Sequence, residues 1–275
     1  MSDFEKPRWL RDLLRFLPLK SQFVLSGNIA DLQVLQLEPE AITTVALYAA
    51  LSMELHRAGF QHVLAFDAVR GVRALSRNGA LSSSDAIIRT LGLTDIECRA
   101  SVAERAHAVI SSVASAEGPP VALLMEFSSR LTVRNDGLNS GEHMLFTQAL
   151  VASLAARARP HGPANQPFYN TIIWIVERET DLPDWLLVGN PAIRHIPIAR
   201  PDHRQRRAMV PGLLRHIPGS EKLNEARWKA AIDDFVEQTE GLLLLDLQSI
   251  MQLCRSEQLT VSQISDAVRR YKVGV

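Results

Sequence analysis

Four short apolar runs, separated by longer helical stretches, constrain the fold of this chain more than any other feature. The runs are residues 22–25 (QFVL), 62–66 (HVLAF), 121–125 (VALLM) and 171–176 (TIIWIV), with a shorter fifth at 195–198 (HIPI). A strand that is buried on both faces has a continuous apolar run, whereas a strand with one solvated face alternates apolar and polar residues. Helices between such strands are typical of βαβ crossovers. The sequence therefore predicts an α/β fold with a five-stranded parallel sheet that helices cover on both faces.

The segments between these runs have the composition of helices, and the strand pattern stops after Pro201. The expected helices are residues 9–16, 40–58, 82–116, 142–158, 204–216, 225–240, 243–256 and 261–271. The last of them follows Thr260 and has Gln263 three residues later, which is typical of a capping box. We therefore expect three parts, namely an N-terminal helix (1–20), an α/β subdomain (21–200) and an all-helical subdomain (201–275).

Charge, cysteine content and hydropathy argue against several classes of protein. The chain has 30 basic and 30 acidic side chains, so it lacks the basic excess of a nucleic-acid binder. No apolar run approaches the length of about 18 residues that a membrane span needs. The two cysteines, Cys98 and Cys254, form neither a disulfide framework nor a zinc motif and suit a reducing compartment. We expect a cytoplasmic protein that binds no membrane, no nucleic acid and no metal.

Three motifs occur in a characteristic order from the fourth strand onward. Pro201, Asp202 and Arg206 follow the fifth strand, the turn 239–242 (TEGL) precedes Asp246-Leu247, and the chain closes on DAVRRYKVGV. This order resembles the AAA+ ATPase family, in particular the N-terminal half of a two-domain bacterial AAA+ protein, from about residue 22 to the end. The resemblance implies a P-loop-NTPase-like sheet of strand order 5-1-4-3-2, followed by a helical lid.

The phosphate-binding loop of that family is missing from this sequence. The family's motif, Gly-x-x-x-x-Gly-Lys-Ser/Thr, cradles phosphates with backbone N–H groups and its lysine. Residues 26–32 are SGNIADL here, and no lysine occurs between Lys20 and Lys222. Asp31 would repel a triphosphate. Gly27 and Asn28 remain as candidate nucleotide-binding residues in a degenerate phosphate loop, the alternative being an ordinary loop at a strand end.

The catalytic carboxylates and arginines of the family are also altered. The third strand ends in Met125-Glu126 rather than Asp-Glu, so Glu126 is the candidate catalytic residue, a vestige of the Walker B pair. Its alternative role is to cap a neighbouring helix or to pair with Arg130. Arg194 and Arg206, in the densest basic cluster of the chain, are candidates for contact with a neighbouring subunit. The alternative there is a solvated helix face.

These departures predict a catalytically degenerate AAA+ domain, a structural or regulatory module in an oligomeric ATPase or in a partner-docking assembly. The expected partners are the chain itself or a related AAA+ subunit, together with other proteins. No cofactor is expected, although ATP with magnesium would be required by the alternative, an active ATPase with an atypical nucleotide-binding loop. The segment 68–73, where AAA+ translocases place a pore loop, contains no aromatic residue to grip a polypeptide. A third hypothesis is an unrelated doubly wound α/β protein, which a different strand order would select.

Overall fold

The computed structural model describes residues 5–38, 41–82, 86–94, 96, 101–134 and 137–274. The described residues form two compact units. The sheet unit consists of those in 8–29 and 48–198, and the helical unit of those in 1–7, 30–47 and 199–275. One division thus falls between Ile198 and Ala199, and the segment 30–47, which we expected in the α/β subdomain, groups with the C-terminal helices.

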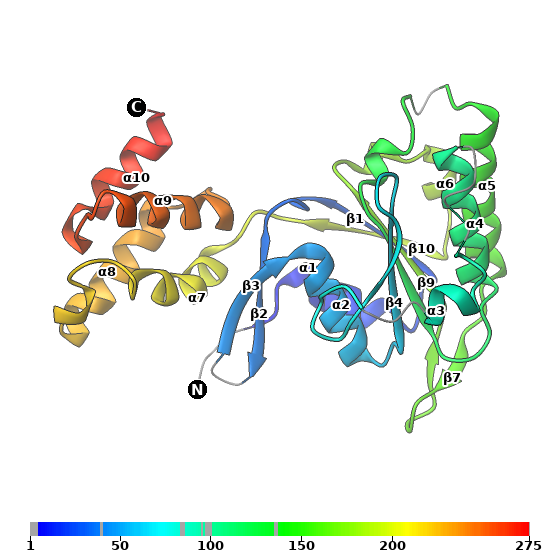
Figure 1. The fold of residues 1–275 in the computed structure, drawn as a ribbon, viewed down its shortest axis with the longest axis horizontal. Helices are drawn as coiled ribbons and strands as arrows, with labels where there is room; N and C mark the ends of the chain where they lie inside the picture. The colour runs from blue at the N-terminus through cyan, green and yellow to red at the C-terminus, as the bar shows by residue number, and fades with distance from the viewer. Residues whose placement is uncertain are drawn as a thin grey trace. The chain divides into compact units, whose positions relative to one another are not determined.

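A mostly parallel sheet forms the centre of the sheet unit (Figure 1). Its strands are β1 (Gln22–Gly27), β4 (His62–Asp67), β5 (Gly71–Leu75), β6 (Val121–Met125), β9 (Thr171–Val176) and β10 (Ile193–Ile198). Their order is β10-β1-β9-β6-β4-β5, and only the pairing of β5 with β4 is antiparallel among them. The five expected strands therefore have the expected order 5-1-4-3-2, which excludes the third hypothesis. The sixth strand, β5, corrects our expectation of a loop at residues 68–73.

Helices cover both faces of this sheet. In Figure 1, α1 (Arg8–Phe16) and α2 (Leu47–Ala58) lie on one side of the strands, and α4 (Val102–Ala114) and α5 (Ser140–Ala155) on the other. Two shorter helices, α3 (Ala86–Thr90) and α6 (Asp184–Leu187), lie on the side of α4 and α5. Trp174 of β9 packs against Phe146 of α5, and its indole N–H donates to the side chain of Gln22. The strands β1, β4, β6 and β9 are buried along nearly their whole length, which explains their continuous apolar runs, whereas the edge strand β10 is only partly buried.

The helical unit contains α7 (His203–Leu214), α8 (Glu225–Gln238), α9 (Leu244–Ser256) and α10 (Ile264–Val273). Their apolar faces share a core with Val34 of an antiparallel hairpin, β2 (Leu32–Glu38) and β3 (Ala41–Ala46). Our single helix over residues 40–58 was therefore wrong in its first part. Residues 42–45 are Ile-Thr-Thr-Val, and β-branched side chains favour a strand over a helix. The capping box of Thr260 and Gln263 is confirmed.

Two features at the margins of the sheet unit escaped the sequence analysis. A small hairpin, β7 (Arg159–His161) and β8 (Gln166–Phe168), lies between α5 and β9, where no strand was predicted. The edge strand β10 contains Pro197, which pairs in register with Ser26 of β1. Ala192 and Ile198 accept hydrogen bonds from β1 through their carbonyl groups, so the even-numbered residues of this strand face β1. Pro197 therefore occupies a position whose backbone nitrogen points away from the sheet.

Gly27 at the end of β1 allows a test of the close packing between β1 and β10. It has a φ of +97°, and a Cβ atom there would lie 2.8 Å from the carbonyl oxygen of Ile198. Gly118 also has a positive φ, +86°, but a Cβ atom added there would meet no other atom within 4 Å. We expect Gly27→Ala to reduce the free energy of unfolding by at least about 1 kcal/mol more than Gly118→Ala, because only Gly27 adds a steric clash to the backbone strain. Urea denaturation of both variants checks this, and equal losses would contradict it.

Candidate functional site

The carboxyl ends of the parallel strands gather the sequence-predicted site residues at one edge of the sheet. Ligands of open α/β sheets bind at this edge. Gly27 and Asn28 lie at the end of β1, and Glu126 follows β6. The neighbouring strand β4 ends in Asp67, a buried acid that the sequence analysis did not single out. Gly27, Asn28 and Glu126 therefore lie at the same edge of the sheet. Their contacts show whether they are available to bind a ligand there.

The backbone N–H groups after β1 already donate to carbonyl groups of the chain itself. Gly27 N–H donates to Glu177 O (3.1 Å), Asn28 N–H to Ile198 O (2.9 Å) and Ile29 N–H to Gly27 O (2.8 Å). A phosphate cradle requires several such N–H groups to point at the ligand. The loop after β1 therefore has the geometry of a closed strand end.

The element that directly follows β1 is the strand β2, and the next helix, α2, begins only at Leu47. The partial positive charge of a helix N-terminus, which normally faces the phosphates, is therefore missing from this position. Asp31, which we expected to repel a triphosphate, has a local structural role in the helical unit. Its carboxylate accepts hydrogen bonds from the N–H groups of Leu244 and Leu245 (3.0 Å each), at the start of α9. Asp31 thus satisfies two N–H groups that the helix itself leaves without partners.

Glu126 belongs to a cluster of four charged side chains. Its carboxylate pairs with Arg70 (3.2 Å) and Arg73. The same two arginines pair with Asp67, at 2.7 Å and 2.6 Å. Asp67 also accepts hydrogen bonds from the backbone N–H groups of Val69 and Arg70, which closes the turn between β4 and β5. The cluster is neutral in sum and largely buried, so each carboxylate is fixed by two guanidinium groups.

The two carboxyl groups of this cluster have pKa values shifted in opposite directions. Burial alone would raise the pKa of Asp67, but the hydrogen bonds from Arg70, Arg73 and Val69 outweigh it and hold the pKa at about 2. Burial raises the pKa of Glu126, and the attraction of Arg73 and Arg70 offsets this only in part. Asp67 is therefore the strongly ionised member, and Glu126 is the acid whose charge is costly to keep buried.

The sequence analysis missed Asp67, Arg70 and Arg73 as partners of Glu126. The available signal was an acid at a strand end, followed by arginines three and six residues later. Arg130, which we considered as a partner, instead pairs with Glu177 at 2.6 Å. Next to Glu126, Phe127 has a φ of +52° and a side chain that is 60% exposed.

A second polar chain connects β1, β10 and the short 3₁₀ helix Glu179–Asp181. Ser26 Oγ lies 2.7 Å from His195 Nε2, and His195 Nδ1 lies 3.2 Å from Glu179. A hydroxyl, an imidazole and a carboxylate in this order could activate a nucleophile. However, Ser26 is buried, and the N–H groups of Gly27, Asn28 and Ile29 in the loop that follows it donate to carbonyl groups. These three N–H groups are therefore not available to an oxyanion, and the observed contacts connect three elements of the sheet unit.

The arginines expected at a subunit interface contact their own unit. The guanidinium of Arg194 lies over the ring of Phe16, 3.6 Å from its centroid. Arg206 is 5% exposed, donates to Pro201 O at 2.8 Å, and burial lowers its pKa. Their role toward a neighbouring subunit stays a prediction, and the observed contacts do not favour it.

The described part of the chain has neither a group of metal ligands nor a helix that could span a membrane. There, no three histidine, cysteine or acidic side chains are grouped to hold a metal ion. No described helix is long and apolar enough to cross a membrane. Cys254 is a buried free thiol, whereas Cys98 lies outside the described residues.

Comparisons with known proteins agree on the fold. Residues 4–199 match the family described as "AAA+ chaperone, N-terminal Rossmann-like domain". Among 89 chains of solved structures that match, one belongs to the HORMA:CdnC:Trip13 complex of E. coli MS115-1. Its TM-score is 0.50 at 12% sequence identity, over 94% of this chain and 77% of that chain. A search of proteins with curated functions finds no match.

Replacing either Asp67 or Glu126 by its amide tests this account of the charged cluster. The pKa of Asp67 is lower in the folded than in the unfolded chain, so its ionisation stabilises the fold above pH 4, and this contribution is lost as the pH falls toward 2. We expect Asp67→Asn to reduce the free energy of unfolding by about 2 kcal/mol at pH 7, and by about half as much near pH 3, where Asp67 is still largely ionised in the folded chain. At pH 7 we expect Glu126→Gln to reduce the free energy of unfolding by less than Asp67→Asn does, because burial already disfavours the charged form of Glu126.

Urea denaturation of the parent chain and both variants at the two pH values measures these differences. Equal losses for the two variants, or a loss for Asp67→Asn that does not change with pH, would contradict this account of the cluster.

Proposed function

The chain belongs to the AAA+ chaperone N-terminal Rossmann-like domain family, and on that premise we propose that it is a catalytically degenerate AAA+ domain. In this proposal it serves as a structural or regulatory module, either in an oligomeric ATPase or in an assembly that docks partner proteins. It neither hydrolyses ATP by itself nor requires a bound cofactor. The two cysteines, of which Cys254 is a buried free thiol, are compatible with a cytoplasmic location.

The loop after β1 is the observation that carries this proposal. A nucleotide there would compete with the carbonyl groups of Glu177, Ile198 and Gly27 for the N–H groups of the loop. A close approach would also have to displace Gly27 from its contact with the backbone of Ile198. These N–H groups lie at an exposed or partly exposed strand end, and a phosphate there would have to replace the hydrogen bonds that they already form.

The surroundings of Glu126 support the same proposal. In the family's reaction, a carboxylate at this position activates water beside magnesium and phosphate. Here two arginines hold the carboxylate of Glu126, and a second carboxylate, that of Asp67, completes the cluster. Both guanidinium groups donate to the same oxygen, Oε2, so a water molecule that used this oxygen would have to replace an existing ion pair. Glu126 in this arrangement stabilises the edge of the sheet.

The proposed structural or regulatory role requires contacts with partner proteins. The solved neighbour belongs to a complex of several proteins, named HORMA, CdnC and Trip13. We propose that this chain likewise acts through protein contacts, with a second copy of itself or with a related AAA+ subunit. The identity of the partner proteins in that complex is a property of the neighbour and is not transferred to this chain.

Calorimetric titration with ATP and with ADP, each with magnesium, tests the degenerate site. We expect no saturable binding at millimolar nucleotide, which corresponds to a binding free energy weaker than about −4 kcal/mol. A P-loop ATPase of known affinity, titrated under the same conditions, is the control. Micromolar binding would instead support the alternative, an active ATPase with an atypical loop, if magnesium-dependent turnover is also abolished by Glu126→Gln.

Light scattering of the purified chain at high concentration tests self-association. If a second copy is the partner, the measured mass should rise above that of one chain as the concentration increases. Because electrostatic contacts weaken with salt, the measurement is repeated at high ionic strength. A strict monomer at every concentration would contradict self-association and leave a related subunit as the proposed partner.

A further inference from the structure

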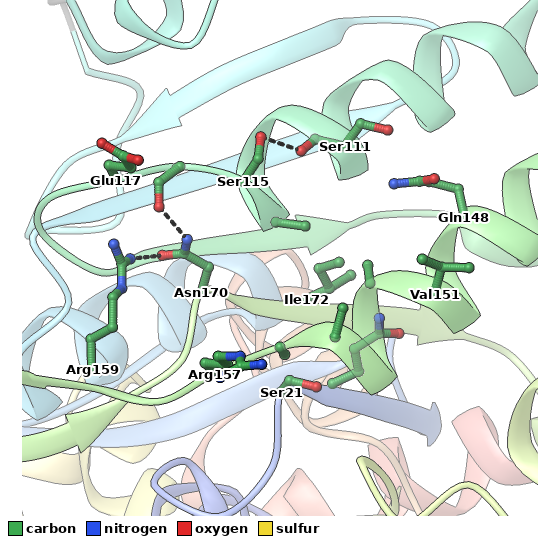
Figure 2. A pocket seen from close by; sticks show the side chains of 16 residues that line it. Ser21, Ser111, Ser115, Glu117, Gln148, Val151, Arg157, Arg159, Asn170 and Ile172 are labelled. Carbon is green, nitrogen blue, oxygen red and sulfur yellow. Dashed lines mark hydrogen bonds between the residues drawn. The ribbon is translucent and has the colours of Figure 1, made fainter.

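A pocket of about 420 Å³ lies at the amino ends of β1 and β9, at the edge of the sheet opposite to Glu126 (Figure 2). It opens between the C-terminal turns of α4 and α5. Small side chains line these turns, namely Ser111, Ala114, Ala116, Ala152, Ala155 and Ala156. Because these side chains are short, the two helices leave space beside the sheet. The volume lies in the lower part of the range of about 300–1,000 Å³ that is typical of small-molecule sites.

Two arginines line this pocket, Arg157 and Arg159. Ala156 has extended backbone angles, and Arg159 begins strand β7. Both arginines therefore lie on the wall of the pocket, in the segment from the end of α5 to the first residue of β7. Neither of them forms an ion pair with any described residue, and two neighbouring positive charges repel each other. An anion between them would relieve this repulsion.

The position of Arg159 is fixed by a fully bonded asparagine. Its Nη2 atom donates to Asn170 Oδ1 at 3.1 Å. The same oxygen accepts from Val121 N–H at 3.2 Å, and the amide of Asn170 donates to Ala116 O at 2.8 Å. Figure 2 shows this contact between Arg159 and Asn170 at the wall of the pocket. One arginine is therefore oriented in advance, and the exposed side chain of Arg157 is free to move onto a ligand.

The rest of the lining is apolar on one side. Val151, Ala152 and Ala155 of α5 face Ile172 of β9, and Figure 2 shows Gln148 next to Val151. Val151 is 53% exposed, although it is an aliphatic residue beside a pocket. A ligand that covered this side would remove apolar surface from water. The pocket thus offers a cationic end and an apolar end.

The charged groups around the pocket favour a ligand that carries a single negative charge. Glu117 also lines the pocket, from the segment that follows α4. The C-termini of α4 and α5 add partial negative charge at the same place. These groups oppose a doubly charged phosphate more strongly than a carboxylate. A carboxylate, moreover, has the planar geometry that arginine binds through two parallel hydrogen bonds.

We propose that this pocket binds a small organic monocarboxylate with an apolar body. The carboxylate contacts Arg157 and Arg159, and the apolar body lies on Val151, Ala152 and Ile172. The site is separate from the nucleotide edge, so this inference goes beyond the proposed function and does not depend on it.

Titration calorimetry of the full chain with hexanoate tests the proposal, with hexanamide as the neutral isostere and inorganic phosphate as the competing anion. We expect saturable binding of hexanoate and none of hexanamide or phosphate at the same concentrations. Arg157→Gln and Arg159→Gln should each weaken hexanoate binding about tenfold or more, which is the scale of one lost charge-assisted hydrogen bond. Ala152→Leu should abolish binding by filling the apolar end.

Arg89→Gln is the matched control, because Arg89 is an exposed arginine on α3 that does not line the pocket. Thermal denaturation verifies that each variant is folded, and Arg157→Gln changes an exposed side chain that the fold does not need. The proposal is overturned if hexanoate shows no saturable binding at millimolar concentration. It is equally overturned if hexanamide or phosphate binds as well as hexanoate, or if the Arg157 and Arg159 variants bind like the Arg89 control.

Discussion

The close approach of β1 and β10 at Gly27 is the constraint on which the carboxyl edge of the sheet depends. Because the backbone of Gly27 lies against Ile198, the chain still forms a hydrogen bond to β10 beyond the end of β1, from Asn28 N–H to Ile198 O. The N–H groups that could hold a phosphate are consumed in this continuation. The chain then enters β2 instead of a helix, so neither the donors nor the helix dipole of a phosphate site are formed. The close approach of Gly27 to Ile198 thus goes together with a strand end whose N–H groups are already bonded within the chain.

Burial of acids at the same edge requires compensation, and the turn between β4 and β5 provides it. An ionised carboxylate in an apolar environment is unfavourable unless it is paired and hydrogen-bonded. Asp67 receives backbone N–H groups and two guanidinium groups, whereas Glu126 receives guanidinium groups alone. Burial and the negative charge of Asp67 raise the pKa of Glu126, whereas hydrogen bonds from backbone N–H groups and from the arginines outweigh burial at Asp67 and lower its pKa. Glu126, the candidate catalytic residue, is thus part of a network of ion pairs at this edge.

The sequence predicted the buried strands well because burial on both faces leaves a continuous apolar run. Strand order followed from the resemblance to a family, since periodicity alone carries no pairing information. The strands that escaped prediction are the hairpin of β2 and β3, the edge strand β5 and the hairpin of β7 and β8, which lie at an edge or in small hairpins without such runs. The partners of Glu126 could not be predicted, because the hairpin formed by β5 brings Arg70 and Arg73 to it from more than 50 residues away. Likewise, the burial of Arg206 depends on how α7 packs, which its arginine-rich sequence conceals.

Pro197 in β10 has a consequence for how this domain can meet other proteins. An exposed sheet edge normally presents a row of N–H groups that an incoming strand can use to extend the sheet. The nitrogen of Pro197 points outward and carries no hydrogen, so that row is interrupted at this edge. A partner that approaches β10 must therefore be recognised through side chains and shape, and chance pairing with unfolded or aggregating chains is disfavoured there.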